Sequence, residues 1–327
     1  MRRWIAWIVS AAVALSCCGC GGVSLSPDER SEALENLQEL DSCYMGMVLK
    51  SLDGQFYPLI KAGAEAEANR LGVELIVVAP DEEDNAQEQA ELVEIMASMA
   101  LDVLAVAPCD EETLADGLQT AADNGKHILA VDEPMDFAGC EGYIGSDNEQ
   151  GGQQQGRFAA GLANHPSAVI LRGMTESGNH QSRTDGLKQA FAESGISPVM
   201  TYNCVSSRSM AHDHVQELLE QNIEMGVICA TNDDMAIGAA RAVREQQKEI
   251  PVVAFDGTPE TLQMVQNGEL AGVVFQDAYA IGAQCVKAAV KLCDGKQVGD
   301  IVLPTQLVTQ DNAEYYMEEI QKRLKDN

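Results

Sequence analysis

Between Tyr44 and the C-terminus, short apolar runs alternate with longer stretches in which apolar residues recur at helical spacing. In the first half, the apolar runs predict strands at Met45–Leu49, Val73–Ala79, Val103–Ala107, Ile128–Val131 and Tyr143–Ile144. In the second half, they predict strands at Ala168–Leu171, Val199–Tyr202, Gly226–Ala230, Val252–Phe255 and Gly272–Phe275. Continuously apolar strands are typical of a parallel sheet that is covered on both faces.

The stretches between these strands predict helices. In the first half they lie near Phe56–Arg70, Asn85–Met99 and Glu112–Asp123. In the second half they lie near Gln155–Ala163, Arg183–Glu193, Val215–Glu220, Met235–Arg244 and Glu260–Gln266, followed by Tyr279–Cys293 and Ala313–Lys325. Strands that alternate with helices in two successive blocks predict an α/β protein with two doubly wound parallel-sheet lobes.

The N-terminus has the pattern of an export signal. Arg2 and Arg3 precede the uncharged run Trp4–Ser16, and small residues follow that run. Thirteen residues span about 20 Å as a helix, which is short of the roughly 30 Å of a bilayer core. We therefore expect residues 1–18 to be a signal peptide and residues 19–43 a polar, flexible tether.

The end of this signal resembles the lipobox of bacterial lipoproteins, in the run Leu15-Ser16-Cys17-Cys18. The resemblance implies lipidation of Cys18, with Cys17 and Cys20 as alternatives. An ordinary signal with incidental cysteines is the competing interpretation. Under the lipoprotein interpretation, the protein is anchored at the outer face of the cytoplasmic membrane by lipid alone; the alternative is a periplasmic protein.

The amino-acid composition limits the kinds of partner that the protein is expected to bind. The 327 residues include 21 basic and 51 acidic side chains, for a formal net charge of −30, and 46% of residues are hydrophobic. Nucleic acid is disfavoured, because phosphates must be met by clustered Lys and Arg. The same acidity disfavours electrostatic docking on an anionic membrane. The chain is long enough for a large core and for two lobes.

The cysteines and acidic runs give no metal site or cofactor site. Beyond the N-terminal cluster of Cys17, Cys18 and Cys20 there are seven cysteines, at 43, 109, 140, 204, 229, 285 and 293, and spacing alone does not give their connectivity. Cys285 and Cys293 are too far apart on one predicted helix to bridge, and most of the thiols are expected to be buried and free.

The run Asp81–Asn85 lacks the glycine and glutamate of a calcium loop. His180, His212 and His214 are expected at the surface.

Polar side chains follow the predicted strands where a ligand would bind. Open parallel sheets bind ligands beyond the carboxyl ends of their strands. In the first half, these positions hold Lys50, the pair Phe56-Tyr57 and the pair Asp132-Glu133. In the second half they hold Arg183, Asn232, Asp256 and Gln276. Carboxylates, amides and an aromatic ring are the groups that bind a polyhydroxylated ligand.

At these residues the chain resembles the ribose/galactose/arabinose-type periplasmic binding proteins, the substrate-binding subunits of bacterial sugar ABC importers. The matching segments are Phe56–Ala64, Ala130–Glu133, Ile144–Asn148, Arg183–Gly186, Thr231–Ala239 and Val253–Pro259. Together they cover, in order, nearly all of Tyr44 to Val308.

The resemblance implies a three-crossing hinge near Asp147, Gln276 and Pro304. One lobe would hold residues 44–147 and 277–304, and the other residues 148–276 and 305–327. The implied ligand contacts are Lys50, Phe56, Tyr57, Asp132, Glu133, Arg183, Asn232, Asp256 and Gln276. The resemblance further implies an extracytoplasmic, monomeric binding protein that captures a monosaccharide or related small polar ligand and engages an ABC permease.

Two departures bear on the ligand. Lys50 stands where the ribose-type proteins have a serine, and Glu133 where they have an arginine, which is closer to the arabinose type. No aromatic residue near Ser206–Arg208 caps the second face of a sugar. Ribose is thus disfavoured, and a charged non-sugar ligand is an alternative, with Lys50 and Arg183 meeting a carboxylate or phosphate.

The sequence gives little support to other functions. No G-x-S-x-G, P-loop or glycine-rich dinucleotide turn indicates an enzyme. A transcription regulator would need a helix-turn-helix where the signal stands. A sensory protein that presents ligand to a chemoreceptor or histidine kinase shares every feature above. Taken singly, Asn232 could only cap a helix and Arg183 could form a surface ion pair.

Overall fold

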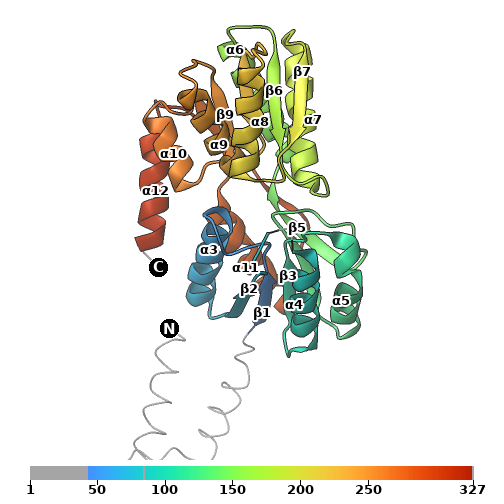
Figure 1. The fold of residues 1–327 in the computed structure, drawn as a ribbon. Coiled ribbons are helices and arrows are strands. Elements are labelled where there is room, and N and C mark those ends of the chain that lie inside the picture. Colours follow the sequence, from blue (N-terminus) through green and yellow to red (C-terminus); the bar gives the residue numbers. More distant parts are fainter. Residues whose placement is uncertain (1–42, 84, 326–327) are drawn as a thin grey trace, which may run out of the picture. The chain divides into compact units, whose positions relative to one another are not determined.

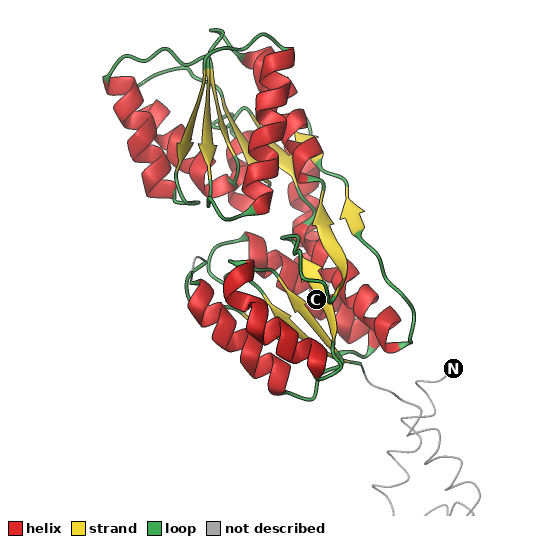
Figure 2. Cartoon of the chain, turned by 90° about the vertical axis from the view of Figure 1, so that its right-hand side faces the viewer, coloured by secondary structure: helices red, strands yellow, loops and turns green. Residues whose placement is uncertain are grey.

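The structure is a computed structural model that describes residues 43–83 and 85–325. Within the part from Cys43 onward, it shows two α/β lobes, each built on a six-stranded sheet (Figure 1). Helices flank each sheet (Figure 2), so the predicted fold class is confirmed. The predicted signal peptide, Cys17, Cys18, Cys20 and residues 19–42 of the predicted tether lie outside the described residues.

The first lobe contains a fully parallel sheet with strand order β11-β5-β4-β3-β1-β2. Its strands are β1 (Tyr44–Val48), β2 (Glu74–Val78), β3 (Val103–Val106), β4 (His127–Val131), β5 (Cys140–Ser146) and β11 (Ile301–Leu303). Its helices are α3 (Phe56–Leu71), α4 (Ala86–Ser98), α5 (Glu111–Asp123) and α11 (Ala278–Cys293). All four residues of β3 are buried, as its unbroken apolar sequence predicts.

The second lobe contains a sheet with strand order β12-β10-β9-β8-β6-β7. Its strands are β6 (Ala168–Arg172), β7 (Val199–Asn203), β8 (Val227–Ala230), β9 (Val252–Asp256), β10 (Gly272–Phe275) and β12 (Gln306–Val308). Its helices are α6 (Asn148–Leu162), α7 (Gly178–Glu193), α8 (Arg208–Glu220), α9 (Asp233–Glu245), α10 (Pro259–Gln266) and α12 (Ala313–Lys325). The edge strand β12 pairs antiparallel with β10, so this sheet is mixed rather than purely parallel.

The chain passes between the two sheets three times. It leaves the first sheet after β5 and enters α6 at Asn148, returns between β10 and α11, and crosses again between β11 and β12. Only two residues, Pro304 and Thr305, separate the last pair of strands. The sequence did not predict β11 and β12, because three-residue strands carry too few positions to show a pattern.

Three helices of the second lobe begin earlier than their apolar periodicity predicts. The side chains of Asp147, Ser177 and Ser207 accept hydrogen bonds from backbone N–H groups at the starts of α6, α7 and α8. The first turns of these helices are rich in glycine and polar residues, so their capping residues rather than their hydrophobicity mark the starts.

One buried glutamine in each lobe bonds to backbone carbonyls of neighbouring strands. Gln89 Nε2 donates to the carbonyls of Leu49 (3.0 Å) and Ala107 (2.8 Å), which follow β1 and β3. Gln155 Nε2 donates to the carbonyl of Ala230 (2.8 Å) and to two carbonyls of β9. Each amide donates to backbone oxygens of two neighbouring strands and so holds these strands together near the edge that carries the polar loops.

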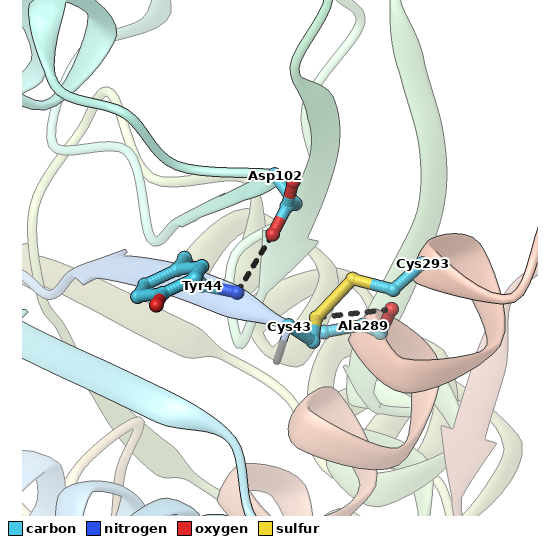
Figure 3. The surroundings of a disulfide bond; sticks show 5 residues. All are labelled: Cys43, Tyr44, Asp102, Ala289 and Cys293. Carbon is cyan, nitrogen blue, oxygen red and sulfur yellow. Dashed lines mark hydrogen bonds between the residues drawn. A yellow bond between two sulfur atoms is a disulfide. The ribbon is translucent and has the colours of Figure 1, made fainter. Parts of the chain in front are cut away.

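A disulfide joins Cys43 to Cys293, the last residue of α11, across 250 positions of sequence (Figure 3). Cys43 is buried and directly precedes β1, so it belongs to the folded body and not, as predicted, to the end of the tether. Cys140, Cys204, Cys229 and Cys285 form no disulfide, as expected for most of the cysteines. Among the described residues, no helix is both long and apolar enough to cross a membrane.

Candidate functional site

Eight of the nine residues predicted to contact a ligand line one cavity of about 100 Å³. The first lobe contributes Lys50, Phe56, Tyr57, Asp132 and Glu133, and the second lobe contributes Arg183, Asn232 and Asp256. Each follows the carboxyl end of a strand or lies near the start of the next helix, as in other open parallel sheets. Gln276, the ninth, does not line the cavity; it is buried and supports Asp256 from behind.

Lys50 and Glu133 form a buried ion pair that reaches the opposite lobe. Lys50 Nζ lies 2.7 Å from Glu133 Oε2. Glu133 also accepts hydrogen bonds from Ser177 Oγ (2.8 Å) and from the backbone N–H of Asn179 (2.9 Å), at the start of α7. A carboxylate is favoured at a helix N-terminus, so this pair attaches the first lobe to α7 of the second.

The protonation of this pair follows from its contacts. Burial alone would lower the pKa of Lys50, but Glu133 and Asp132 raise it to about 12. Burial would likewise raise the pKa of Glu133, but Lys50 and the donors from α7 lower it overall. Both groups are therefore charged at neutral pH. The lysine is engaged by its own lobe rather than held ready for an anionic ligand.

Asp132 presents a partly unsatisfied carboxylate to the cavity. Its backbone has a positive φ of 64°, which turns the chain sharply after β4. Oδ2 accepts a hydrogen bond from Tyr57 Oη at 3.1 Å, whereas Oδ1 has no partner in the described part of the chain. Burial raises the pKa of Asp132 to about 6, with Glu133 adding to the rise and Lys50 and Arg183 opposing it.

Arg183 organises the wall of the second lobe. Its Nε donates to Asn148 Oδ1 (2.7 Å), and its Nη1 donates to the carbonyl of Thr231 (2.7 Å) and to Asp256 Oδ1 (3.0 Å). The guanidinium lies 4.0 Å from the centre of the Phe255 ring, in a cation–π contact. Arg183 is thus a buried residue of the site and not a surface ion pair.

Asp256 is held on two sides at the end of β9. Its Oδ1 accepts from Arg183 and from Gln276 Nε2, the latter at 2.7 Å. Burial raises the pKa of Asp256 well above its usual range even though Arg183 lowers it. Gln276 therefore acts as a positioning residue for Asp256 rather than as part of the cavity wall.

Asn232 and Phe56 each have a second role in the fold. Asn232 Oδ1 accepts from the N–H of Met235 at 3.0 Å, so it caps α9 and lines the cavity at once. Phe56 stands edge-on to Tyr57, with the ring centres 5.4 Å apart, at the start of α3. The aromatic pair follows the loop from β1 and gives the first lobe an apolar face toward the cavity.

The sequence missed several residues of the lining. They are Asp53, Gly54, Gln55, Glu83, Ser177, Asn179, His180, Arg208, Asp233, Asp234, Ile237 and Thr258. Asp233 directly follows Asn232 and could have been found by the same strand-end reasoning. Ser177 and Asn179 were hidden because the start of α7 was predicted five residues too late.

His180 corrects an expectation about surface histidines. It is buried, its Nδ1 lies 2.8 Å from Thr231 Oγ1, and its Nε2 lies 3.2 Å from Ser206 Oγ. Burial lowers the pKa of this imidazole well below its usual range, and nearby Arg183 lowers it further. The ring is therefore neutral and holds the hydroxyl-bearing loops of the second lobe in place.

A second contact between the lobes lies at the rim of the cavity. Gln55 Nε2 donates to Glu260 Oε2 (3.0 Å), and the N–H of Glu260 donates to Gln55 Oε1 (3.1 Å). Glu260 in turn accepts from Arg208. Gln55 belongs to the first lobe and Glu260 to α10 of the second, so these two hydrogen bonds join the lobes directly.

Replacing Gln55 by Ala should weaken ligand binding about 5-fold, since two partly exposed hydrogen bonds contribute about 1 kcal/mol in net. Calorimetric titration with the ligand would measure the change. Stability should be nearly unaffected, because the Gln55 side chain makes no capping hydrogen bond to α3. The matched control is Gln119→Ala, at an exposed position of α5. Equal affinity of the Gln55 variant and wild type would show that the two hydrogen bonds between Gln55 and Glu260 do not contribute to ligand binding.

Comparison with known proteins agrees with this geometry. The model of the periplasmic binding protein domain family matches residues 45–297. A ribose import binding protein of Salmonella typhimurium is 28% identical, over 78% of this chain and 86% of its own length. The D-allose-binding periplasmic protein of Escherichia coli is also 28% identical, over 78% of this chain and 85% of its own.

A solved structure extends the likeness to three dimensions. The solute-binding protein of an ABC transporter from Bacillus halodurans, solved with bound myo-inositol, superposes with a TM-score of 0.78 at 28% identity. The match covers 85% of this chain and 98% of the other. These relatives are extracytoplasmic binding proteins of transport systems and not enzymes. From its matched span, its two lobes joined by three crossings of the chain, and the cavity that both lobes line, the chain belongs to the periplasmic binding protein domain family.

Proposed function

We propose that the protein binds a monosaccharide or a cyclic polyol of similar size between its lobes and delivers it to an ABC importer. The observation that carries this proposal is the composition of the cavity. Carboxylates, amides and basic groups from both lobes surround it, next to the Phe56-Tyr57 pair. Such groups bind vicinal hydroxyls in pairs, while a ring packs against the apolar face of the sugar.

The relatives support this ligand class. Those named above are described as binding ribose or D-allose, and the Bacillus halodurans protein was solved with myo-inositol. Sugars and cyclic polyols share a ring with several hydroxyl groups. Lys50 and Glu133 form an ion pair at the positions where ribose-type proteins carry serine and arginine, so we do not expect ribose itself to be the preferred ligand.

Hinge closure is the proposed mechanism. The crossings near Asp147, Gln276 and Pro304 would separate a lobe of residues 44–147 plus 277–304 from a lobe of residues 148–276 plus 305–327. Only the closed arrangement brings groups of both lobes to one ligand, so ligand binding shifts the population toward that arrangement. A permease that recognises the closed form would then receive only loaded protein.

The proposal includes a location and an attachment. Export by residues 1–18 and lipidation of Cys18, with Cys17 and Cys20 as alternatives, would place the protein at the outer face of the membrane. We propose that it acts there as a monomer. Mass spectrometry of the protein from a lipidating host would identify the modified cysteine, and an unmodified N-terminus would refute the anchor.

A thermal-shift screen of the mature protein over pentoses, hexoses, inositols, sugar acids and amino sugars tests the function. A true ligand at about 100 times its Kd should add about 2.7 kcal/mol of stability and raise the melting temperature by several degrees. Asp256→Ala should lose the shift, whereas Asp116→Ala, at an exposed position of α5, should keep it. The proposal is refuted if no polyhydroxylated compound shifts the melting temperature of the wild-type protein.

A further inference from the structure

The cavity carries more acidic groups than a neutral ligand requires. Its lining includes seven carboxylates, namely Asp53, Glu83, Asp132, Glu133, Asp233, Asp234 and Asp256. It includes three basic side chains, namely Lys50, Arg183 and Arg208. Asp53 and Asp234 are exposed, but four of the carboxylates, Asp132, Glu133, Asp233 and Asp256, are buried, against two buried basic groups, Lys50 and Arg183. The acidic excess therefore remains where charge is poorly screened.

The three basic groups are already paired within the protein. Lys50 pairs with Glu133 at 2.7 Å, and Arg183 pairs with Asp256 at 3.0 Å. Arg208 pairs with Asp234 at 2.6 Å and with Glu260 at 3.0 Å. An anionic ligand would have to compete with these carboxylates and would add to the negative charge, so the geometry argues against the carboxylate or phosphate ligand considered from the sequence.

Two buried carboxylates keep an oxygen without a partner. Asp132 is 3% exposed and Asp233 is 4% exposed, and within the described chain the Oδ1 atom of each lacks a hydrogen bond. Asp132 comes from the end of β4 in the first lobe, and Asp233 begins α9 in the second. A buried carboxylate oxygen left unpaired is costly, and the cost falls if a ligand supplies a donor or a positive charge.

We infer that the ligand of this cavity carries a protonated amine, held by Asp132 and Asp233, in addition to its hydroxyl groups. The class is an amino sugar or an aminated cyclic polyol, so this inference rests on the proposed function and narrows it. An ammonium group donates three hydrogen bonds and neutralises part of the carboxylate excess. A hydroxyl group at the same place can donate only one hydrogen bond and neutralises no charge.

The two carboxylates also make the selectivity depend on pH. Burial raises the pKa of Asp132 to about 6 and that of Asp233 to about 7. The groups that act on the pKa of Asp132 include Lys50, Glu133, Arg183, Glu83, Asp256 and the Tyr57 hydroxyl. Asp256 acts on Asp233, and hydrogen bonds from residues 257, 258 and 261 oppose the rise of its pKa. Affinity for a protonated amine should therefore rise as the pH increases from 5.5 to 7.5, because both carboxylates must be deprotonated to bind it and the amine keeps most of its charge over this range.

The test compares the tightest-binding neutral sugar or cyclitol from the screen with its monoamino derivatives, in which one hydroxyl at a time is replaced by an amine. Calorimetry at pH 7.5 should show at least one amine that binds 10-fold or more tightly than the neutral parent. Its advantage should shrink to about 2-fold or less at pH 5.5. At pH 5.5 the amine is fully protonated and both carboxyl groups still hold much of their protons, so titration there in two buffers of different ionisation enthalpy should reveal proton release on binding of the amine.

Matched variants assign the effect to the two carboxylates. Asp132→Asn and Asp233→Asn should each reduce the amine's advantage over the parent at least 5-fold, whereas the exposed Asp116→Asn should leave it unchanged. If a variant fails to fold, the buffer titration of the wild-type protein still tests the inference: proton release supports it, and no release contradicts it. Tight binding of the neutral parent with no gain from any amine overturns this inference and leaves the proposed function standing. Absence of binding by parents and amines alike overturns both.

Discussion

Replacing Arg183 by Ala should abolish ligand binding and lower the free energy of unfolding by about 3–5 kcal/mol. The guanidinium satisfies Asn148, the carbonyl of Thr231 and Asp256 at once, and all of these groups lie at or behind the cavity wall. Without it, Asp256 stays buried with Gln276 as its only side-chain donor within the described chain. Urea denaturation would measure the stability, and calorimetry the binding.

The pH dependence of this variant has a defined sign. The pKa of Asp256 is already raised in the folded protein, and loss of Arg183 removes the charge that opposes this rise. The folded state of the variant then binds a proton that the unfolded state releases above about pH 4. Its stability should therefore fall more steeply than that of wild type as the pH increases from 4 to 8.

Two further variants separate folding from binding. Arg183→Ala combined with Asp256→Asn should recover part of the lost stability, because no buried charge is left unpaired, yet it should not recover binding. Arg157→Ala, at an exposed position of α6, should change neither property. If Arg183→Ala kept the ligand affinity of wild type, the assignment of Arg183 to the binding site would be wrong.

Replacing Cys43 or Cys293 by Ser should lower the free energy of unfolding by about 2–5 kcal/mol and leave ligand affinity close to that of wild type. The bond closes a loop of 250 positions, and a crosslink over such a length restricts the unfolded chain strongly. Denaturation with and without a reducing agent would measure the effect. The two bond partners lie outside the cavity lining, so affinity should be preserved.

Control variants for the disulfide are available in the same chain. Cys140→Ser removes a partly buried free thiol and should cost far less than loss of the bond. Reduction should destabilise wild type but not Cys43→Ser, since the variant has no bond to lose. Equal stability of wild type in oxidising and reducing buffer would show that the bond does not form in solution.

The strand pattern was readable from sequence because the strands are buried on both faces. Val103–Val106 and Val227–Ala230 are apolar at every position, and no other environment of the fold produces such short, unbroken runs beside amphipathic helices. The polar residues at the strand ends could be found for the same reason. Once the strands are placed, topology brings their carboxyl ends to one edge.

The ion pairs and the disulfide could not be predicted from the sequence in the same way. Lys50 and Arg183 looked like free cations for an anionic ligand, because a sequence does not reveal that Glu133 and Asp256 lie within 3.0 Å of them. The partner of Cys43 lies 250 positions away, so its identity depends on the packing of α11 beside β1. The unpaired oxygens of Asp132 and Asp233 likewise emerge only from the closed packing of both lobes.

The disulfide also determines how mechanical load enters the folded body. Cys43 joins the residues before it to β1, a central strand of the first sheet that is paired with β2 and β3. A force applied from the N-terminal side at Cys43 would otherwise act along β1 and shear it from its two neighbours. With the bond in place, part of that force passes directly into α11, which packs along α3 (Figure 1). The strand whose far end carries Lys50 is thereby shielded from tension.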